Sequence, residues 1–299
     1  MLYYHRNDNF GDALNGWLWA RLAPEFERES QDRLILGIGT ILSKNVPKRP
    51  LKEVFGAGWS GGNKPTICPK WRFWCVRGPH TADGLGLDRT LAVTDPGVLV
   101  KLCVGGPEAD ADRVGFMPHH RSMEAADWEV LCREIGLTCI DPRLPVGTVL
   151  RELRRCRLVI TEAMHGAIVS DALGIPWIPV ALYPWFNAFK WRDWTDSLGI
   201  EGTPVKLCPI FHSGPKRSKL VLNLMKRGSV KVNLGKDGWR SLPLRTTSPE
   251  DQKKTLLKLR HLVCNRTAVL SCRDRLGESI AELEKRLEKV REVCAAGEN

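Results

Sequence analysis

Residues 159–169 carry the clearest chemical signal in the sequence, because an apolar run stops at a polar turn and passes at once into a helical pattern. His165 lies at that junction. Ligands of open parallel sheets bind outside the carboxyl ends of the strands, where the next helix offers amide N–H groups and a positive dipole to an anion. An imidazole there can donate a hydrogen bond or a proton to a phosphate or carboxylate. We therefore predict an anion site that includes His165, with a histidine that only caps the turn as the alternative.

A second junction of the same kind follows the apolar run at residues 73–76. Pro79 suits the first turn of a helix, so we expect Arg77 to project from the end of the strand into a cleft. A guanidinium in that position can bind a carboxylate or a phosphate through two parallel hydrogen bonds. The alternative is an arginine that pairs with an acidic side chain at the surface.

Two further groups of cations follow predicted strands. His119, His120 and Arg121 form one group, in which we expect one histidine to serve the structure and the other, with Arg121, to reach an anionic ligand. Lys190 and Arg192 lie within an aromatic stretch, where ring faces can stack on sugars while the cations attract a charged donor. A cluster at the edge of the core is the alternative for its aromatic residues, which are Tyr183, Trp185, Phe186, Phe189, Trp191 and Trp194.

Polar side chains also gather before the first predicted helix. Asn9, Asp12 and Asn15 are the candidates there for binding a substrate. Asp12 has two possible roles, as the cap of the helix or as a group that holds acceptor hydroxyls.

These residues need a scaffold of strands and helices, and the apolar pattern predicts one. Strands at residues 114–117, 137–140, 157–161 and 177–182 alternate with helices at 123–135, 147–156 and 166–173. The first third has strands at residues 33–38, 53–55, 71–76 and 91–94, and a helix at 11–22. Strands that alternate with helices pair in parallel through right-handed crossovers. We therefore predict an α/β fold with two Rossmann-like domains facing a cleft, at residues 1–106 and 107–200.

The last hundred residues do not continue the alternation of strands and helices. Residues 201–247 predict a basic loop or hairpin, and residues 248–299 predict amphipathic helices that form a C-terminal helical extension. In the last helix, Leu276, Ile280, Leu283, Leu287 and Val290 recur at alternating four- and three-residue steps. Such a stripe can be a coiled-coil seam for a partner or can fold back on its own protein.

Composition and charge narrow the class of protein. The apolar fraction of 43% allows real cores, no apolar run is long enough to span a bilayer, and the start does not resemble a secretory signal. We therefore expect a cytoplasmic protein whose ten scattered cysteines are reduced and mostly buried, with no metal site. Residues 213–246 carry a net charge of +8, out of +11 for the whole chain. Such a segment can bind an anionic glycan, nucleic acid or the inner membrane leaflet, and the alternative is a solvated loop with no partner.

Taken in order, the motifs resemble those of the polysaccharide pyruvyl transferase family. The resemblance covers roughly residues 3–195, and within the family the overall pattern of the motifs is most similar to the succinoglycan ketalase type. The basic segment and the terminal helix fall outside it. The matching elements are Asn9-Phe10-Gly11-Asp12, Val76-Arg77-Gly78-Pro79, Leu85-Gly86-Leu87, Asp95-Pro96, Met164-His165-Gly166-Ala167, Asp171-Ala172-Leu173-Gly174-Ile175-Pro176 and Lys190.

The resemblance implies a fold similar to that of the GT-B glycosyltransferases, with phosphoenolpyruvate as the donor substrate and no other cofactor. The implied acceptor is a sugar diol of a growing exopolysaccharide, as a polymer or as a lipid-linked oligosaccharide, and a protein working on the latter is expected at the periphery of the inner membrane. Ketal formation needs an acid, a base and a clamp for the anion. We assign His165 as the acid or phosphate-side donor, Arg77 as the carboxylate clamp, and Asp12 or Glu162 as the base.

One departure from the family pattern affects the donor site. Many members carry Arg-Leu-His at the second junction, where this chain has Ala163-Met164-His165. An expected cation is absent, so His120, Arg121, Lys190 or Arg192 has to replace it. Gly166 is also expected to contact the substrate, as is His119.

Two other functions compete with pyruvyl transfer. A glycosyltransferase that uses a nucleotide sugar needs the same two-domain cleft and basic pocket. A nucleic-acid binder would use the basic segment and show steep salt dependence. We favour the pyruvyl transferase and expect no nucleic-acid partner.

Overall fold

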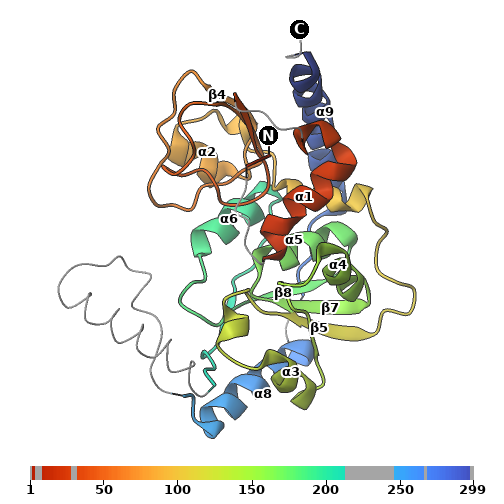
Figure 1. Ribbon diagram of the computed structural model, residues 1–299. Helices are drawn as coiled ribbons and strands as arrows, with labels where there is room; N and C mark the ends of the chain where they lie inside the picture. Colours follow the sequence, from red (N-terminus) through yellow and green to blue (C-terminus); the bar gives the residue numbers. More distant parts are fainter. Residues whose placement is uncertain (1, 4–8, 28–31, 213–245, 266–267, 297–299) are drawn as a thin grey trace, which may run out of the picture.

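The computed structural model describes residues 2–3, 9–27, 32–212, 246–265 and 268–296 and contains two parallel β-sheets with helices packed on them (Figure 1). The predicted α/β class is confirmed. The first sheet has the order β1-β2-β3-β4 and the second the order β6-β5-β7-β8-β9. The domain boundaries predicted above stay a prediction.

The first sheet consists of short strands that end in turns. Its strands are β1 (Leu2–Tyr3), β2 (Arg33–Leu36), β3 (Leu51–Phe55) and β4 (Trp71–Cys75). The helical segments between and after them are α1 (Phe10–Leu22), η1 (Pro24–Glu27), α2 (Pro79–Leu85), η2 (Arg89–Leu91) and η3 (Pro96–Leu102). Pro79 occupies the first turn of α2, as predicted, because its missing N–H has no partner to lose there.

The second sheet reverses its strand order between β5 and β7. Its strands are β5 (Arg113–Met117), β6 (Thr138–Cys139), β7 (Cys156–Thr161), β8 (Trp177–Ala181) and β9 (Val205–Lys206). The strand that follows β5 in the chain lies on one side of it, whereas the later strands continue on the other side. Loops that leave two such strands diverge and open a crevice at the carboxyl ends. The topology therefore favours the loops after β5 and β7 as the place for a ligand.

Helices cover both faces of the second sheet. They are η4 (Ser122–Glu124), α3 (Trp128–Glu134), α4 (Val146–Arg154), α5 (Met164–Leu173), α6 (Ala188–Ser197) and α8 (Pro249–Asn265). Figure 1 shows α4 and α5 on one side of the sheet and α3 and α8 on the other. Successive strand residues point to opposite faces, so Val159 joins the core of α4 and α5 while Leu158 and Ile160 join the core of α3 and α8.

The first sheet is covered in the same way. Leu14, Leu18 and Trp19 of α1 pack in one core with Ile35 and Phe55 of the sheet. The opposite face packs against α2 through residues that include Leu36, Val54 and Ala82. The core under α1 also holds residues of α4 and α5. The two sheets therefore share one hydrophobic core on the side of α1.

The long C-terminal helix α9 (Arg273–Ala296) folds back on its own protein. The stripe predicted from Leu276 to Val290 is buried in the core that also holds α1. Arg286 of α9 donates a hydrogen bond to the carbonyl oxygen of Trp74 at 2.6 Å and so fixes the helix against β4. The alternative in which this stripe is a seam for a partner is wrong, because these side chains are already covered.

Replacing a buried leucine of α9 should destabilise the whole protein. Leu283 is fully buried, and we expect Leu283→Ala to lower the free energy of unfolding by about 2–5 kcal/mol, since the cavity forms in the shared core. Urea denaturation followed by circular dichroism measures this loss. Leu257 on α8 is 52% exposed, and Leu257→Ala should change the free energy of unfolding by less than about 0.5 kcal/mol. Equal effects of the two substitutions would contradict the docking of α9.

Four predictions about local structure need correction. The predicted strand at residues 91–94 is only an isolated bridge between Val76 and Ala92, because η2 precedes it. The predicted helix at 123–135 is divided into η4 and α3, where the Asp127 side chain caps the start of α3. Strand β9 was not predicted. All ten cysteines are free, but only Cys75, Cys132 and Cys156 are buried, whereas Cys68, Cys208, Cys264 and Cys272 are exposed.

The basic loop or hairpin predicted at residues 201–247 is described only at its two ends. Residues 213–245 lie outside the described residues. The membrane contact predicted from their charge therefore stays a prediction.

Candidate active site

Segments that follow strands of the two sheets contact each other. The amide of Phe10, at the start of α1, donates a hydrogen bond to the carbonyl oxygen of Pro142 after β6 at 2.7 Å. Helix η3, which comes after β4, packs against α5, which comes after β7. Residues that follow strands of the two sheets are therefore brought side by side.

His165 pairs with a carboxylate from the other sheet. Its Nε2 atom lies 3.6 Å from Oδ2 of Asp95, and its side chain is 13% exposed. Both atoms are buried and have no hydrogen-bond partner among the described residues. The second oxygen of Asp95 accepts a hydrogen bond from the amide of Gly97 at 2.9 Å. A small movement would thus join the imidazole and the carboxylate in a charge-assisted hydrogen bond.

Gly11 makes room for this imidazole. A Cβ atom at position 11 would lie 2.0 Å from Nδ1 of His165, far inside the contact distance. Only glycine allows the His165 ring to lie against the start of α1. The glycine at position 11 and the histidine at position 165 therefore depend on each other through this contact.

Asp95 is a site residue that we did not predict. Burial alone raises the pKa of its carboxyl group, but His165, Arg77 and the Gly97 amide together outweigh burial and lower that pKa. Asp95 is therefore a carboxylate at neutral pH. The available signal was the Asp95-Pro96-Gly97 turn after an apolar run, which is the same kind of junction that singled out His165.

Lys190 places a half-buried ammonium group at the same site. Its backbone amide is held by the side chain of Asn187, which caps α6, but Nζ makes no hydrogen bond or ion pair to any residue that the structure describes. Burial and then the Arg77 charge lower the pKa of Lys190 to about 8, while Asp12 and Asp95 oppose this shift. A partly desolvated cation that forms no direct salt bridge is a signal of an anion site.

The loop after β5 holds its two histidines differently. Nδ1 of His119 accepts a hydrogen bond from the amide of Arg121 at 3.3 Å. Burial, followed by the charges of His120, Lys190 and Arg121, lowers the pKa of His119 to about 2, so this ring is neutral. Nδ1 of His120 is buried without a partner among the described residues, and Arg121 is exposed. His120 and Arg121 are therefore available to a ligand, whereas His119 shapes the loop.

Glu162 anchors that loop. Its carboxylate accepts hydrogen bonds from the Ser122 hydroxyl at 2.5 Å, from the His119 amide at 3.1 Å and from the Tyr183 amide at 3.1 Å. Burial raises the pKa of Glu162, although these hydrogen bonds oppose the shift. Both oxygens are engaged, so these contacts do not support the predicted role of a base.

The polar residues at and before the start of α1 have different roles. Asn15 is fully buried and exchanges hydrogen bonds with both the amide and the carbonyl group of Ile38, at 2.8 and 2.9 Å. It holds the turn after β2 rather than a ligand. Asn9 donates to Oδ2 of Asp12 at 3.1 Å. Asp12 is 8% exposed and acts electrostatically on both Lys190 and His120, so it lies next to the site cations.

The prediction that Arg77 projects into the cleft is wrong. Its side chain is fully buried, and Nε lies 2.9 Å from Oδ2 of Asp193 on α6. The other two nitrogens donate to the hydroxyl of Thr40 and to the carbonyl oxygen of Trp59, at 2.9 and 2.8 Å. A buried guanidinium requires such partners, and these use the directions that a ligand would need.

The remaining predicted residues lie at the edge of the site or outside it. The amide of Gly166 donates to the carbonyl oxygen of Ala163 and is not free for an anion. Arg192 is exposed on α6. Among the aromatic residues, Tyr183, Trp191 and Trp194 belong to the buried cores, as the core alternative predicts, whereas Trp185, Phe186 and Phe189 are half-buried.

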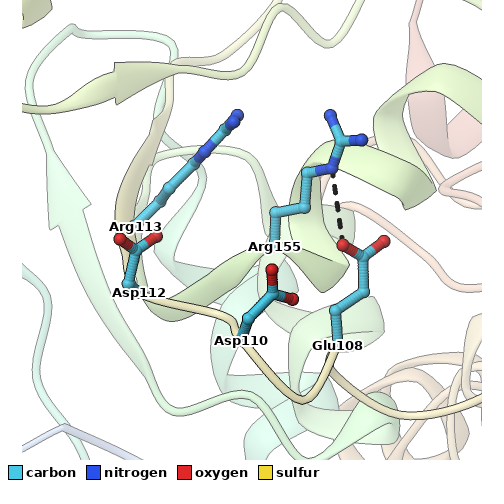
Figure 2. Close-up of a pocket in the computed structure, with 5 residues that line it drawn as sticks. All are labelled: Glu108, Asp110, Asp112, Arg113 and Arg155. Atoms are coloured by element: carbon cyan, nitrogen blue, oxygen red, sulfur yellow. Dashed lines mark ion pairs between the residues drawn. The ribbon is translucent and has the colours of Figure 1, made fainter.

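A separate polar pocket lies at the other end of the second sheet. Figure 2 shows its lining by Glu108, Asp110, Asp112, Arg113 and Arg155, around a volume of about 240 Å³. Arg113 begins β5 and Arg155 immediately precedes β7, so the pocket is at the amino ends of these strands. Because ligands of open parallel sheets bind at the carboxyl ends, this pocket is not the candidate site.

Comparison with known proteins identifies the family of the chain. Residues 15–182 match the sequence profile of the polysaccharide pyruvyl transferases, which is more than half of the chain. The chain belongs to this family. It is also similar to the succinoglycan biosynthesis protein ExoV of Rhizobium meliloti (strain 1021), with 39% identity over 202 residues that cover 65% of this chain and 63% of that protein. The chain thus spans less than two thirds of the length of this relative. No solved structure matches the chain.

The family match includes most of the residues around the crevice. Arg77, Asp95, the loop at residues 119–121 and His165 fall within residues 15–182, whereas Asp12 and Lys190 lie just outside this range. None of the helices in the described part of the chain combines the length and the hydropathy that a membrane crossing requires.

Proposed function

We propose that this polysaccharide pyruvyl transferase moves a pyruvyl group from phosphoenolpyruvate to two hydroxyl groups of a sugar in an exopolysaccharide repeat unit. The observation that carries the proposal is the buried pair of His165 and Asp95, which lies in one electrostatic cluster with the unpartnered ammonium of Lys190. The pair can supply a proton, and the ammonium can bind a small anion.

The reaction needs both of these properties. A proton adds to the methylene carbon of phosphoenolpyruvate, and the neighbouring carbon becomes cationic. One acceptor hydroxyl adds to this carbon, phosphate leaves, and a second hydroxyl completes the ketal. Of the two hydroxyl protons, one replaces the proton that the acid gave up, and the other leaves with phosphate. The catalyst must therefore hold an acid beside the methylene carbon and cations beside the phosphate and carboxylate.

The charges around the crevice suit these roles. His165 is the acid, and Asp95 holds the ring and stabilises its protonated form. Lys190, Arg121 and His120 bind the phosphate and carboxylate groups and replace the cation that Ala163 does not supply. Asp12, next to Lys190 and His120, is the base toward the acceptor.

Two wider features belong to the same proposal. The two parallel sheets with carboxyl ends facing each other form a GT-B-like cleft, and the acceptor is a lipid-linked oligosaccharide or a polymer. The supporting observations are the switch point between β5 and β7 and the contacts of α1 and η3 across to the second sheet.

Ligand-induced stabilisation tests the donor. Phosphoenolpyruvate at a hundredfold excess over its dissociation constant should stabilise the protein by about 2.7 kcal/mol, whereas nucleoside diphosphates should not. Phosphate release from phosphoenolpyruvate in the presence of candidate oligosaccharides then tests the transfer. Stabilisation by nucleoside diphosphates alone would support a glycosyltransferase and overturn the proposal.

A further inference from the structure

Helix α6 lies between strands β8 and β9 of the second sheet in the chain, but it is also fastened to the first sheet region. It packs against α2, and its Phe189 ring lies 5.2 Å from the Trp59 ring in an edge-on contact. At the far end of the helix, Ser197 donates a hydrogen bond to Thr94 at 2.9 Å. Lys190 is in the first turn of this helix. The position of the Lys190 ammonium therefore depends on how firmly α6 is held to the first sheet.

The strongest of these contacts is a cap that α6 supplies to α2. Helix α2 starts at Gly78, which has no side chain to cap it. Oδ1 of Asp193 accepts a hydrogen bond from the amide of Thr81 at 2.7 Å, and Oδ2 accepts one from the Thr81 hydroxyl at 2.6 Å. Asp193 thus does for α2 what an N-cap aspartate does within its own helix.

Close packing makes this cap possible. A Cβ atom at position 78 would lie 1.8 Å from the carbonyl oxygen of Asp193. Glycine at this position lets the backbone of α6 lie directly on the start of α2. The Arg77-Gly78-Pro79 motif is therefore the contact surface for α6. Pro79 begins α2, Gly78 leaves space for the backbone of α6, and Arg77 binds the Asp193 carboxylate.

Arg77 completes the attachment with a buried ion pair. Its Nε lies 2.9 Å from Oδ2 of Asp193, and both side chains are fully buried. Two charges in this environment depend on each other, since either one alone would be left uncompensated. The same guanidinium also hydrogen-bonds to Thr40 and Trp59. Three turns of the first sheet region are thus joined to α6 through one arginine.

We propose that Asp193 is a positioning residue, which caps α2, pairs with Arg77 and so fixes α6 with Lys190 in the donor site. This inference rests on the proposed function only for the identity of the donor, phosphoenolpyruvate. The attachment itself follows from the contacts of Asp193.

Amide hydrogen exchange tests the attachment without any activity measurement. In Asp193→Asn, the carboxamide presents a donor to Arg77, so we expect the amides of α6 and α2 to exchange about tenfold faster or more. The amides of α5 should keep their wild-type protection. Asp196→Asn is the matched comparison on the same helix, because it breaks an exposed pair with His80 of α2, at 2.6 Å, and leaves the buried contacts of Asp193 in place, so it should speed exchange much less. Wild-type exchange in α6 of Asp193→Asn would overturn the proposal, and so would equal loss of protection in α5.

The KM for phosphoenolpyruvate tests the consequence for the site. Asp193→Asn should raise this KM by about tenfold or more and change kcat less, because the lost property is the placement of a binding cation. Asp196→Asn should leave both within about twofold. Faster exchange in α6 with an unchanged KM would overturn the link to Lys190. If the wild type neither binds nor turns over phosphoenolpyruvate, the proposed function fails while the exchange experiment still decides the attachment.

A milder pair of variants covers the case in which Asp193→Asn does not fold. Thr81→Val removes the hydroxyl that donates to Asp193 and accepts from the Trp59 amide but keeps the amide cap and the ion pair, whereas Thr81→Ser keeps the hydroxyl. We expect α6 to exchange faster and the KM to rise in Thr81→Val relative to Thr81→Ser. Equal exchange and equal KM in the two folded variants would overturn the proposal.

Discussion

His165→Ala is expected to lower kcat for phosphate release by about 10²–10⁴-fold, the range that general acid catalysis contributes. An imidazole can transfer a proton, and Nε2 of His165 lies 3.6 Å from Oδ2 of Asp95. Initial rates with saturating phosphoenolpyruvate measure the loss. The ring is 13% exposed and lies against Gly11, so alanine leaves a cavity and should lower the thermal midpoint; rates are therefore compared at a temperature at which the variant is folded.

A matched control separates the site from a general effect of losing a histidine. His261 is exposed on α8, so His261→Ala should leave kcat within about twofold. A folded His165→Ala protein with a near wild-type rate would remove His165 from the mechanism.

Asp95→Asn extends the same prediction to the pair. The carboxylate acts through His165, so the double variant with His165→Ala should be no slower than His165→Ala alone. Multiplicative losses would show that Asp95 and His165 act independently.

Lys190→Met is expected to raise the KM for phosphoenolpyruvate by about 10–100-fold, since a hydrogen bond to a charged group contributes about 1.5–3 kcal/mol. Methionine has a similar length and removes a half-buried charge that forms no direct ion pair with a described residue, so the free energy of unfolding should change little. Lys253 is exposed on α8, and Lys253→Met is the control that should keep the wild-type KM. A Lys190→Met protein with unchanged KM would exclude the ammonium from donor binding.

The pH dependence of kcat/KM provides a second measurement on the same residue. Burial and then the Arg77 charge lower the pKa of Lys190 to about 8, which lies within an accessible pH range. Below this value the group is an ammonium that binds an anion, and above it the group is neutral. We therefore expect kcat/KM for phosphoenolpyruvate to fall as the pH rises through about 8, and this fall should be absent in Lys190→Met. A fall that persists in the variant would assign the titration to another group.

In the proposed function, Lys190 takes the place of the arginine that the family resemblance leads us to expect at position 163. Lys190 comes from α6, between β8 and β9, while Asp12 and Asp95 come from the first sheet region and act on the pKa of Lys190. Contacts between the two halves of the chain bring these segments together. The proposed donor cation thus comes from a different element, and its place depends on these contacts.

Local pattern was sufficient for most of the secondary structure. The apolar run at residues 157–161 is β7, the helical spacing at 11–22 is α1, and Pro79 starts α2. These features depend on neighbouring residues, through side-chain periodicity and the missing N–H of proline. The same signals failed at residues 91–94, where a tight turn before Ala92 leaves only one bridging residue.

The sequence also showed the strand-to-helix junctions that contain His165, Arg77 and residues 119–121, because each junction lies where an apolar run ends. What each side chain does there was decided by tertiary structure. Arg77 and Asp193 are 116 residues apart, and their ion pair exists only because α6 lies on α2. Asp95 faces His165, and Gly11 lies under its ring, because η3 and α1 pack against α5. Periodicity and turn chemistry act between neighbours in the chain, whereas the partner of a buried charge is set by which surfaces pack together.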